Sequence, residues 1–256
     1  MLHKKDLALL ERVQAFYGVG TIIKGIDSVC FSVQSIKDLR NVIIPHFDRY
    51  PLVGEKQADF LLFKSIVELM YKQKHLTIEG LREIVSISAS LNLGLSDGLV
   101  KAFPDITPIK RAKLEAPETI DPHWLTGFVD GEGCFFVGCS SSKAYRVGYQ
   151  IQLKFILTQH YRDIQLMEKL VNYFGCGTIT FDSRKSVVFY TVTNFSCIIK
   201  KIIPFFNKYP LEGAKHLDFQ DFCKVAELMI KKAHLTESGL EEIQRIKARM
   251  NTQRVQ

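Results

Sequence analysis

The feature that most constrains the fold of this chain is a long internal repeat. The segment from Ile43 to Phe60 recurs from Ile202 to Phe219, with eleven of the 18 positions identical at an offset of 159 residues. Upstream, Phe16–Ile22 matches Tyr173–Ile179 at an offset of 157 residues. A repeat of this length indicates a duplication, so the fold should contain the same supersecondary unit twice.

The two copies differ in length. The change of offset predicts a two-residue insertion in the second copy, between Ile179 and Ile202. His3 aligns with His160, so the residues from about 120 to 158 have no counterpart in the first copy. We therefore expect the first copy to lack its front, namely one helix and two strands.

This alignment predicts the domain organisation. The stretch between the copies contains several Gly and Pro residues and a basic cluster, which is typical of an extended, exposed linker. The expected parts are a partial first unit over 1–92, a linker over 93–119 and a complete second unit over 120–256.

Local patterns predict the elements of the second unit. Residues 163–174 carry a helical apolar stripe that begins at Asp163, as N-cap, and ends at Gly175. A β-hairpin follows, and then three helices, the last of which is capped by Thr236 as its counterpart is by Thr77. The expected strands are 178–181 and 186–192, and the expected helices are 194–207, 216–232 and 236–250.

A further strand is expected over 145–157, because apolar and polar residues alternate there. Its polar face carries Arg146, Gln150, Gln152 and Lys154, which are residue types that read base edges and phosphates in a DNA major groove. An ordinary solvated face would show the same alternation, so the strand alone leaves both interpretations open.

Composition excludes some classes of protein. The 256 residues are 46% hydrophobic and 24% charged, which excludes a disordered or fibrous chain. Lys and Arg number 34 against 27 acidic residues, and the net charge of +7 favours a polyanionic partner. The six cysteines form no CxxC pair and are expected to be reduced, buried thiols of an intracellular protein. No apolar run is long enough for a membrane span, and no signal peptide is visible.

The head of the second copy carries the pattern on which the functional prediction depends. Asp121 followed by Pro122 predicts a helix start. Gly127 and Gly131 each cost helix propensity of about 1 kcal/mol, which is explained if another backbone packs closely there. Glu132 then lies at the helix exit, where its carboxylate is suited to a hard divalent cation. The alternative is that Asp130 and Glu132 are solvated turn residues.

Residues Leu125–Gly133 (Leu-Thr-Gly-Phe-Val-Asp-Gly-Glu-Gly) resemble the signature of the LAGLIDADG homing endonucleases. The resemblance extends over essentially the whole chain, and the duplication strengthens it. It implies an α+β fold of two tandem half-domains of the type α-β-β-α-β-β-α, each with a four-stranded antiparallel sheet in the DNA major groove. The two signature helices would pack together, and the first half-domain would be N-terminally incomplete.

The resemblance also implies site residues. Glu132 matches the acid that binds Mg²⁺ at the scissile phosphate, Asp130 matches a structural position, and Lys56 and Lys215 match basic residues near the cleaved phosphate. The residues expected to contact DNA lie in the two sheets and their turns: Arg146, Gln150, Gln152, Lys154, Thr178, Thr180, Arg184 and Lys185 in the second, and Thr21, Lys24, Ser32 and Gln34 in the first.

Three functions follow. The first is a site-specific, intron-encoded endonuclease of the mitochondrion that hydrolyses long double-stranded DNA targets with Mg²⁺, and that is a monomer once its missing segment is supplied. The second is a degenerate member of that family that binds DNA, or assists splicing of intron RNA as a maturase, without cutting. The third is an unrelated basic α/β scaffold, which the repeat argues against. None of the three involves a membrane.

Overall fold

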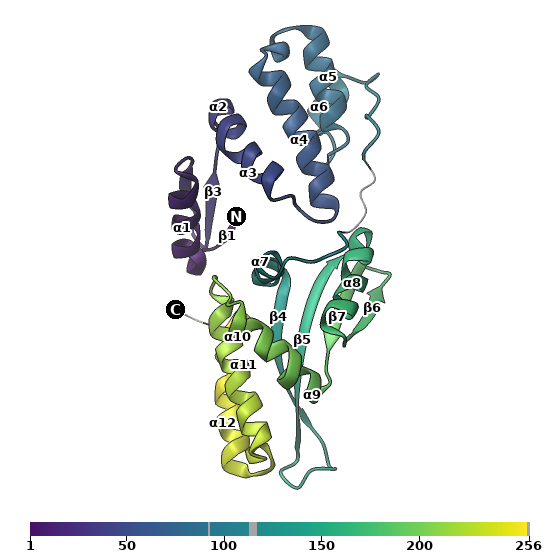
Figure 1. The fold of residues 1–256 in the computed structure, drawn as a ribbon. Helices are drawn as coiled ribbons and strands as arrows, with labels where there is room; N and C mark the ends of the chain where they lie inside the picture. Colours follow the sequence, from purple (N-terminus) through teal and green to yellow (C-terminus); the bar gives the residue numbers. More distant parts are fainter. Residues whose placement is uncertain (92, 113–116, 255–256) are drawn as a thin grey trace. The chain divides into compact units, whose positions relative to one another are not determined.

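The computed structural model describes residues 1–91, 93–112 and 117–254. The chain divides into two units, residues 1–116 and 117–256 (Figure 1). Across the described residues, no helix has the length and apolar character needed to cross a bilayer.

The first unit combines a small antiparallel sheet with helices. Its strand order is β1-β3-β2, and β2 and β3 form a hairpin in which Thr21 pairs with Ser32. The elements are β1 (Leu2–His3), α1 (Leu7–Tyr17), β2 (Thr21–Lys24), β3 (Ser28–Ser32), α2 (Ile36–Asp38), a π-type turn (Leu39–Ile43), α3 (Ile44–Arg49), α4 (Glu55–Tyr71), α5 (Ile78–Ser88) and α6 (Asp97–Ala102).

Strand β1 corrects one expectation, because the first sheet was expected to have two strands and has three. His3 pairs with Ser28 as its counterpart His160 pairs with Val187, so β1 corresponds to the last residues of a longer strand in the second unit. A two-residue strand is too short to produce an alternation pattern, so β1 could not be predicted from local periodicity.

The segment expected to be an extended linker is partly folded against the first unit. After α6, Asp105 forms an ion pair with Arg82 of α5. The hydroxyl groups of Ser86, in α5, and Ser90, just after it, donate hydrogen bonds to the backbone carbonyls of residues 107 and 109. Arg111 then contacts Asp59 of α4 at 2.7 Å. The segment up to Arg111 is therefore fixed to the first unit by side-chain contacts, which Gly and Pro composition does not reveal.

The second unit contains every element that the repeat predicts. Figure 1 shows α7 leading into the long strands β4 and β5. The elements are α7 (Pro122–Glu132), β4 (Gly133–Ser141), β5 (Tyr149–His160), α8 (Ile164–Phe174), β6 (Thr178–Asp182), β7 (Val187–Val192), α9 (Phe195–Cys197), a π-type turn (Ile198–Ile202), α10 (Ile203–Lys208), α11 (Lys215–Ile230) and α12 (Glu237–Lys247). The sheet is fully antiparallel, in the order β4-β5-β7-β6.

One face of this sheet forms the core. Phe135 of β4 packs against Phe206 of α10 and Phe222 of α11, with each pair of ring centroids 5.4 Å apart, and Phe155 of β5 contacts Phe174 of α8. These side chains are nearly fully buried. Helices therefore cover this face, and the alternate residues of the same strands form the opposite face.

Most of the expected local signals are confirmed, with three corrections. Asp163 holds the N-cap position of α8, but its side chain makes no capping hydrogen bond to that helix. Thr77 and Thr236 cap α5 and α12, and Gly175 ends α8 in the left-handed region. The two-residue insertion lies in the second hairpin, between β6 and β7. Strand β5, however, begins at Tyr149 and not at residue 145, because Gly148 has a φ of +76° and closes a turn. The described cysteines are free, as expected, but half-buried and not fully buried.

Candidate functional site

The outward face of the second sheet is polar along β5 and β6. Gln150, Gln152 and Lys154 alternate with the buried Ile151, Leu153 and Phe155, so they project from the face that the helices leave uncovered. Lys154 pairs with Phe136 across β4, and its ammonium lies 5.9 Å from the centroid of that ring. This contact keeps a positive charge over the sheet while leaving it accessible.

The polar face continues across the sheet to its other edge. Thr178 and Thr180 are exposed on β6 and pair with Thr191 and Phe189 of β7, which pair in turn with Ile156 and Thr158 of β5. Because directly paired residues point to the same side of an antiparallel sheet, these threonines share the face of Lys154. The structure thus brings together five of the expected DNA-contacting residues: Gln150, Gln152, Lys154, Thr178 and Thr180.

The remaining basic residues of this set lie in turns. Arg146 was expected on the strand and lies in the turn between β4 and β5, because the turn closes at Gly148. Arg184 and Lys185 lie in the turn between β6 and β7, where Arg184 is 87% exposed and pairs with Asp182. The register places the two turns at opposite ends of β5, so basic groups flank the polar face at both ends.

The first sheet places its four expected residues less uniformly. Thr21 and Ser32 are paired and share one face. Lys24 pairs with the buried Val29 and therefore lies on the opposite, core-side face at the end of β2. Gln34 lies beyond β3 and is exposed. Lys24 therefore does not share the face of Thr21 and Ser32, because the strand period of two places residues 21 and 24 on opposite sides.

Helix α7 forms as its sequence predicts. The carboxylate of Asp121 accepts hydrogen bonds from the backbone N–H groups of His123 and Trp124, at 2.8 and 2.9 Å. Gly127 and Gly131 are exposed, and a methyl group at either position would have no described atom within 4 Å. The glycine face of α7 is therefore open. Glu132, the last residue of the helix, is also exposed.

The exit of α7 is held by two polar contacts with the start of α11. Asp130 Oδ2 accepts hydrogen bonds from the backbone N–H groups of Glu212 and Gly213, at 2.7 and 3.1 Å. Lys215 Nζ donates to the carbonyls of Val129 and Gly131, at 3.0 and 3.3 Å. Both contacts satisfy groups at a helix end, and the lysine also complements the negative end of the helix dipole.

Burial and nearby carboxylates have opposite effects on the pKa of Lys215. Burial lowers the pKa of Lys215 below its ordinary value, while the carboxylates of Asp130, Glu132 and Asp218 act in the opposite direction. The ammonium is thus close to the end of α7 and to Glu132. Lys56, its counterpart in the repeat, is an exposed residue in the first turn of α4.

The exit of α7 offers a hard cation few protein ligands. Among the described residues, no group of three or more His, Cys, Asp and Glu side chains could hold a metal ion. Mg²⁺ does not need such a group, because it keeps several waters and binds through one or two carboxylates together with substrate phosphates. Glu132 would therefore supply one protein ligand, and the other ligands would come from phosphate, from water and from a second carboxylate.

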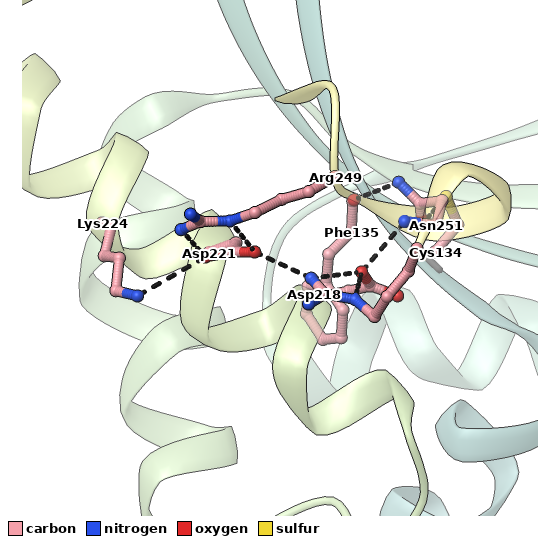
Figure 2. A network of polar contacts seen from close by, with 8 residues as sticks. Cys134, Phe135, Asp218, Asp221, Lys224, Arg249 and Asn251 are labelled. Carbon is pink, nitrogen blue, oxygen red and sulfur yellow. Dashed lines mark hydrogen bonds and ion pairs between the residues drawn. The ribbon is translucent and has the colours of Figure 1, made fainter. Parts of the chain in front are cut away.

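A buried ionic network next to this site had no clear sequence signal. Asp218 and Asp221 of α11 are only 4% and 3% exposed. Arg249, which follows α12, binds Asp221 (Figure 2), and Arg254 binds both aspartates. The repeat could have indicated Asp218, because Asp59 occupies the equivalent position. The arginine partners lie about 30 residues away in sequence, and no local pattern connects them.

The fold and this arrangement of residues agree with what sequence comparison finds. The family model described as LAGLIDADG endonuclease matches residues 1–67 and 125–226, so the chain belongs to the LAGLIDADG endonuclease family. The match spans both copies of the repeat.

Individual relatives agree with this assignment. The chain is 45% identical over 246 residues to the probable intron-encoded endonuclease 3 of Neurospora crassa, covering 94% of this chain and 46% of the relative. It is 41% identical over 259 residues to the probable intron-encoded endonuclease 2 of the same organism, covering 96% and 56%. The chain thus spans about half the length of these curated relatives.

The fold is that of a solved homing endonuclease. The crystal structure of I-SmaMI bound to cleaved DNA matches with a TM-score of 0.97 and 46% sequence identity, over 99% of this chain and 85% of I-SmaMI. I-SmaMI has also been solved bound to uncleaved target DNA in the presence of calcium ions. The expected α+β fold with two antiparallel sheets is confirmed by this match.

Proposed function

We propose that this chain acts as a site-specific DNA endonuclease of the intron-homing type, which hydrolyses phosphodiester bonds in double-stranded DNA with Mg²⁺. The observation that carries the proposal is the position of Glu132. Its exposed carboxylate lies at the end of α7, close to Lys215. The next residue, Gly133, begins β4, the first strand of the sheet that carries the polar face. The names of the relatives support the activity, and the complexes of I-SmaMI support DNA as the partner.

The polar face accounts for binding. Gln, Thr and Lys side chains on a broad antiparallel sheet can donate to and accept from base edges, while basic residues in the flanking turns neutralise phosphates. Counterion release from these contacts makes the affinity salt-dependent. Five of the groups belong to one sheet (Gln150, Gln152, Lys154, Thr178 and Thr180), so their spacing can match a fixed stretch of target.

The exit of α7 accounts for the chemistry. Glu132 would hold a divalent cation together with phosphate oxygens, and such a cation lowers the pKa of an attacking water and stabilises the leaving oxygen. Lys215 is held on the carbonyls of Val129 and Gly131 and keeps a positive charge where negative charge develops. Two lysines of I-SmaMI have been replaced by alanine, singly and together, and they are separated along that chain by the same interval as Lys56 and Lys215.

The origin of the gene is part of this proposal. Relatives include a protein in the ND4 intron 1 of Podospora anserina and an endonuclease named Cox1-I1b of Schizosaccharomyces pombe. These names support an intron of a fungal mitochondrial gene as the source, with mitochondrial localisation. The proposed target is the intron-less form of the host gene at the intron insertion site, which the protein binds as a monomer.

The test is a cleavage assay on DNA that spans the insertion site, with Mg²⁺. Glu132→Gln removes the charge and keeps the shape, so it should abolish cutting and leave the dissociation constant for DNA within about threefold, because Glu132 lies at the end of α7 and not among the side chains of the polar sheet face. Glu168→Gln on the exposed side of α8 is the matched control and should cut normally. Unchanged cutting by Glu132→Gln would refute the role of Glu132.

A second function, binding to DNA or to the intron RNA without cleavage, is favoured by one observation. The polar face of β5 and β6, with its flanking basic turns, can bind nucleic acid without any group from the exit of α7. Binding with a steep salt dependence and no cutting under any Mg²⁺ concentration would support this second function. Double-strand cutting by the chain would exclude it.

A further inference from the structure

The segment that follows α12 is bound to the helix that carries Lys215. Arg254 donates to Asp218 Oδ1 at 2.9 Å and to Asp221 Oδ2 at 2.7 Å, and its own side chain is only 11% exposed. One guanidinium therefore bridges two carboxylates that are almost fully buried on α11. A buried, bidentate arginine of this kind fixes geometry strongly, because any movement leaves an unpaired charge in a low-dielectric environment.

Asn251 extends this attachment to the beginning of β4. Its backbone N–H donates to Asp218 Oδ1 at 2.9 Å, and its Nδ2 donates to the carbonyl of Phe135 at 3.2 Å. The thiol of Cys134 donates to Asn251 Oδ1 at 3.6 Å. Asn251 has a φ of 57°, a left-handed conformation that asparagine tolerates. One residue thus connects α11 to the strand that starts directly after Glu132.

These contacts lie close in sequence to both groups of the candidate catalytic site, Lys215 on α11 and Glu132 at the end of α7. Lys215 and Asp218 are three residues apart on α11, so they lie on the same side of the helix. Cys134 is two residues after Glu132.

The first unit makes an equivalent contact with a residue from a different place. Arg111 binds Asp59 at 2.7 Å and Glu55 at 2.9 Å on α4, which also carries Lys56. Asp59 is the repeat counterpart of Asp218, but the counterpart of Arg254 at the same offset would be Leu95. The duplication therefore does not account for the shared contact, since each unit reaches its aspartate with an arginine from a different position after its last repeat helix.

We propose that these post-helical segments are clasps that position the catalytic lysines, with Arg254 and Asn251 acting on Lys215 and the exit of α7, and Arg111 acting on Lys56. Arg254, Asn251 and Arg111 are positioning residues and touch no substrate. The assignment rests on the proposed nuclease function for its catalytic consequence. Its structural consequence, a fixed orientation of α11 against β4, can be measured without any cleavage.

The structural test is hydrogen exchange on the full chain, comparing Arg254→Met with the matched variant Arg249→Met. Arg249 contacts Asp221 but not Asp218, and its side chain is 53% exposed. We expect Arg254→Met to accelerate exchange about tenfold in residues 212–219 and 132–136 while leaving β6 and β7 unchanged. Arg249→Met should change these segments by less than about twofold. Equal acceleration in both variants, or uniform acceleration over the second unit, would overturn the clasp.

The catalytic test is a double-mutant cycle in single-turnover cleavage with saturating protein and Mg²⁺. Arg254→Met should slow cutting about tenfold in the wild-type background and have no further effect in a Lys215→Met background, because it acts through Lys215. The dissociation constant for DNA should not change. Multiplicative losses in the two backgrounds would overturn the proposal, since they would indicate a general loss of stability.

Two safeguards keep the result decisive. Arg254→Lys retains the charge but cannot bridge both carboxylates, so it takes the place of Arg254→Met in both measurements if the methionine variant does not fold. A wild-type chain that fails to cut its target would refute the nuclease function, and the exchange measurement would still support or overturn the clasp.

Discussion

The buried carboxylate of Asp221 should make the second unit sensitive to acid in a way that can be calculated. Arg249 and Arg254 hold the pKa of Asp221 at about 2, against an ordinary value of 3.8, although burial alone would raise it. A pKa that is depressed in the folded state stabilises the fold above the unfolded-state pKa. This stabilisation is lost as the pH falls from about 4 to about 2.

The magnitude follows from the pKa difference. Each pKa unit corresponds to about 1.4 kcal/mol, so Asp221 contributes roughly 2 to 3 kcal/mol to the free energy of unfolding at neutral pH. By pH 3 about 1 kcal/mol of that contribution is lost. In Asp221→Asn the contribution is absent at every pH, and the two arginines lose a charged partner. We therefore expect the variant to be about 3 kcal/mol less stable at pH 7 and about 2 kcal/mol less stable at pH 3.

The assay uses the single tryptophan of the chain. Trp124 lies on α7 and stacks on Phe128, so its fluorescence during urea unfolding reports on the second unit and avoids mixing the transitions of two units. Asp182→Asn is the control, because its partner Arg184 is largely exposed and the pair should contribute less than about 1 kcal/mol at either pH. A stability difference for Asp221→Asn that is the same at pH 7 and pH 3 would refute the reasoning.

Two further predictions concern packing and DNA binding. Gly177 has a φ of +94°, and a Cβ there would lie 2.4 Å from Cε2 of the buried Tyr190, so Gly177→Ala should destabilise the second unit by more than about 2 kcal/mol in the same urea assay. Gly148→Ala is the control, since its φ is also positive but its surroundings are open, and it should cost about 1 kcal/mol. Lys154→Ala should weaken DNA binding and reduce the slope of log affinity against log salt by about 1, as measured by fluorescence anisotropy; an unchanged slope would place Lys154 away from phosphate.

Much of the second unit could be predicted because its signals are local. Asp121 and Thr236 cap their helices through bonds to residues two or three positions away, and the alternation of β5 needs only neighbouring residues. The duplication then transferred each assignment to the first unit. Where a local pattern misled, the cause was also local: Tyr145 continued the alternation into a turn that Gly148 closes.

The contacts that organise the candidate site could not be predicted in the same way. Asp218 and Arg254 are distant in sequence, and both belong to polar residue types that are exposed in most proteins. Nothing in their immediate neighbours indicates that the two side chains are buried together. The same is true of Arg111, which lay in a segment whose composition indicated an extended linker and which instead binds Asp59 and Glu55.

The two lysines at equivalent positions of the repeat, Lys56 and Lys215, have different surroundings. Lys215 is partly desolvated because the end of α7 lies beside it, and its ammonium replaces water with the carbonyls of Val129 and Gly131. Lys56 has the same place in its copy, but the described part of the first unit contains no counterpart of α7, and Lys56 is exposed. An ammonium fixed in a partly dry site stabilises a developing phosphate charge far more than a solvated one. The value of Lys215 in the proposed reaction therefore depends on the signature helix that lies beside it.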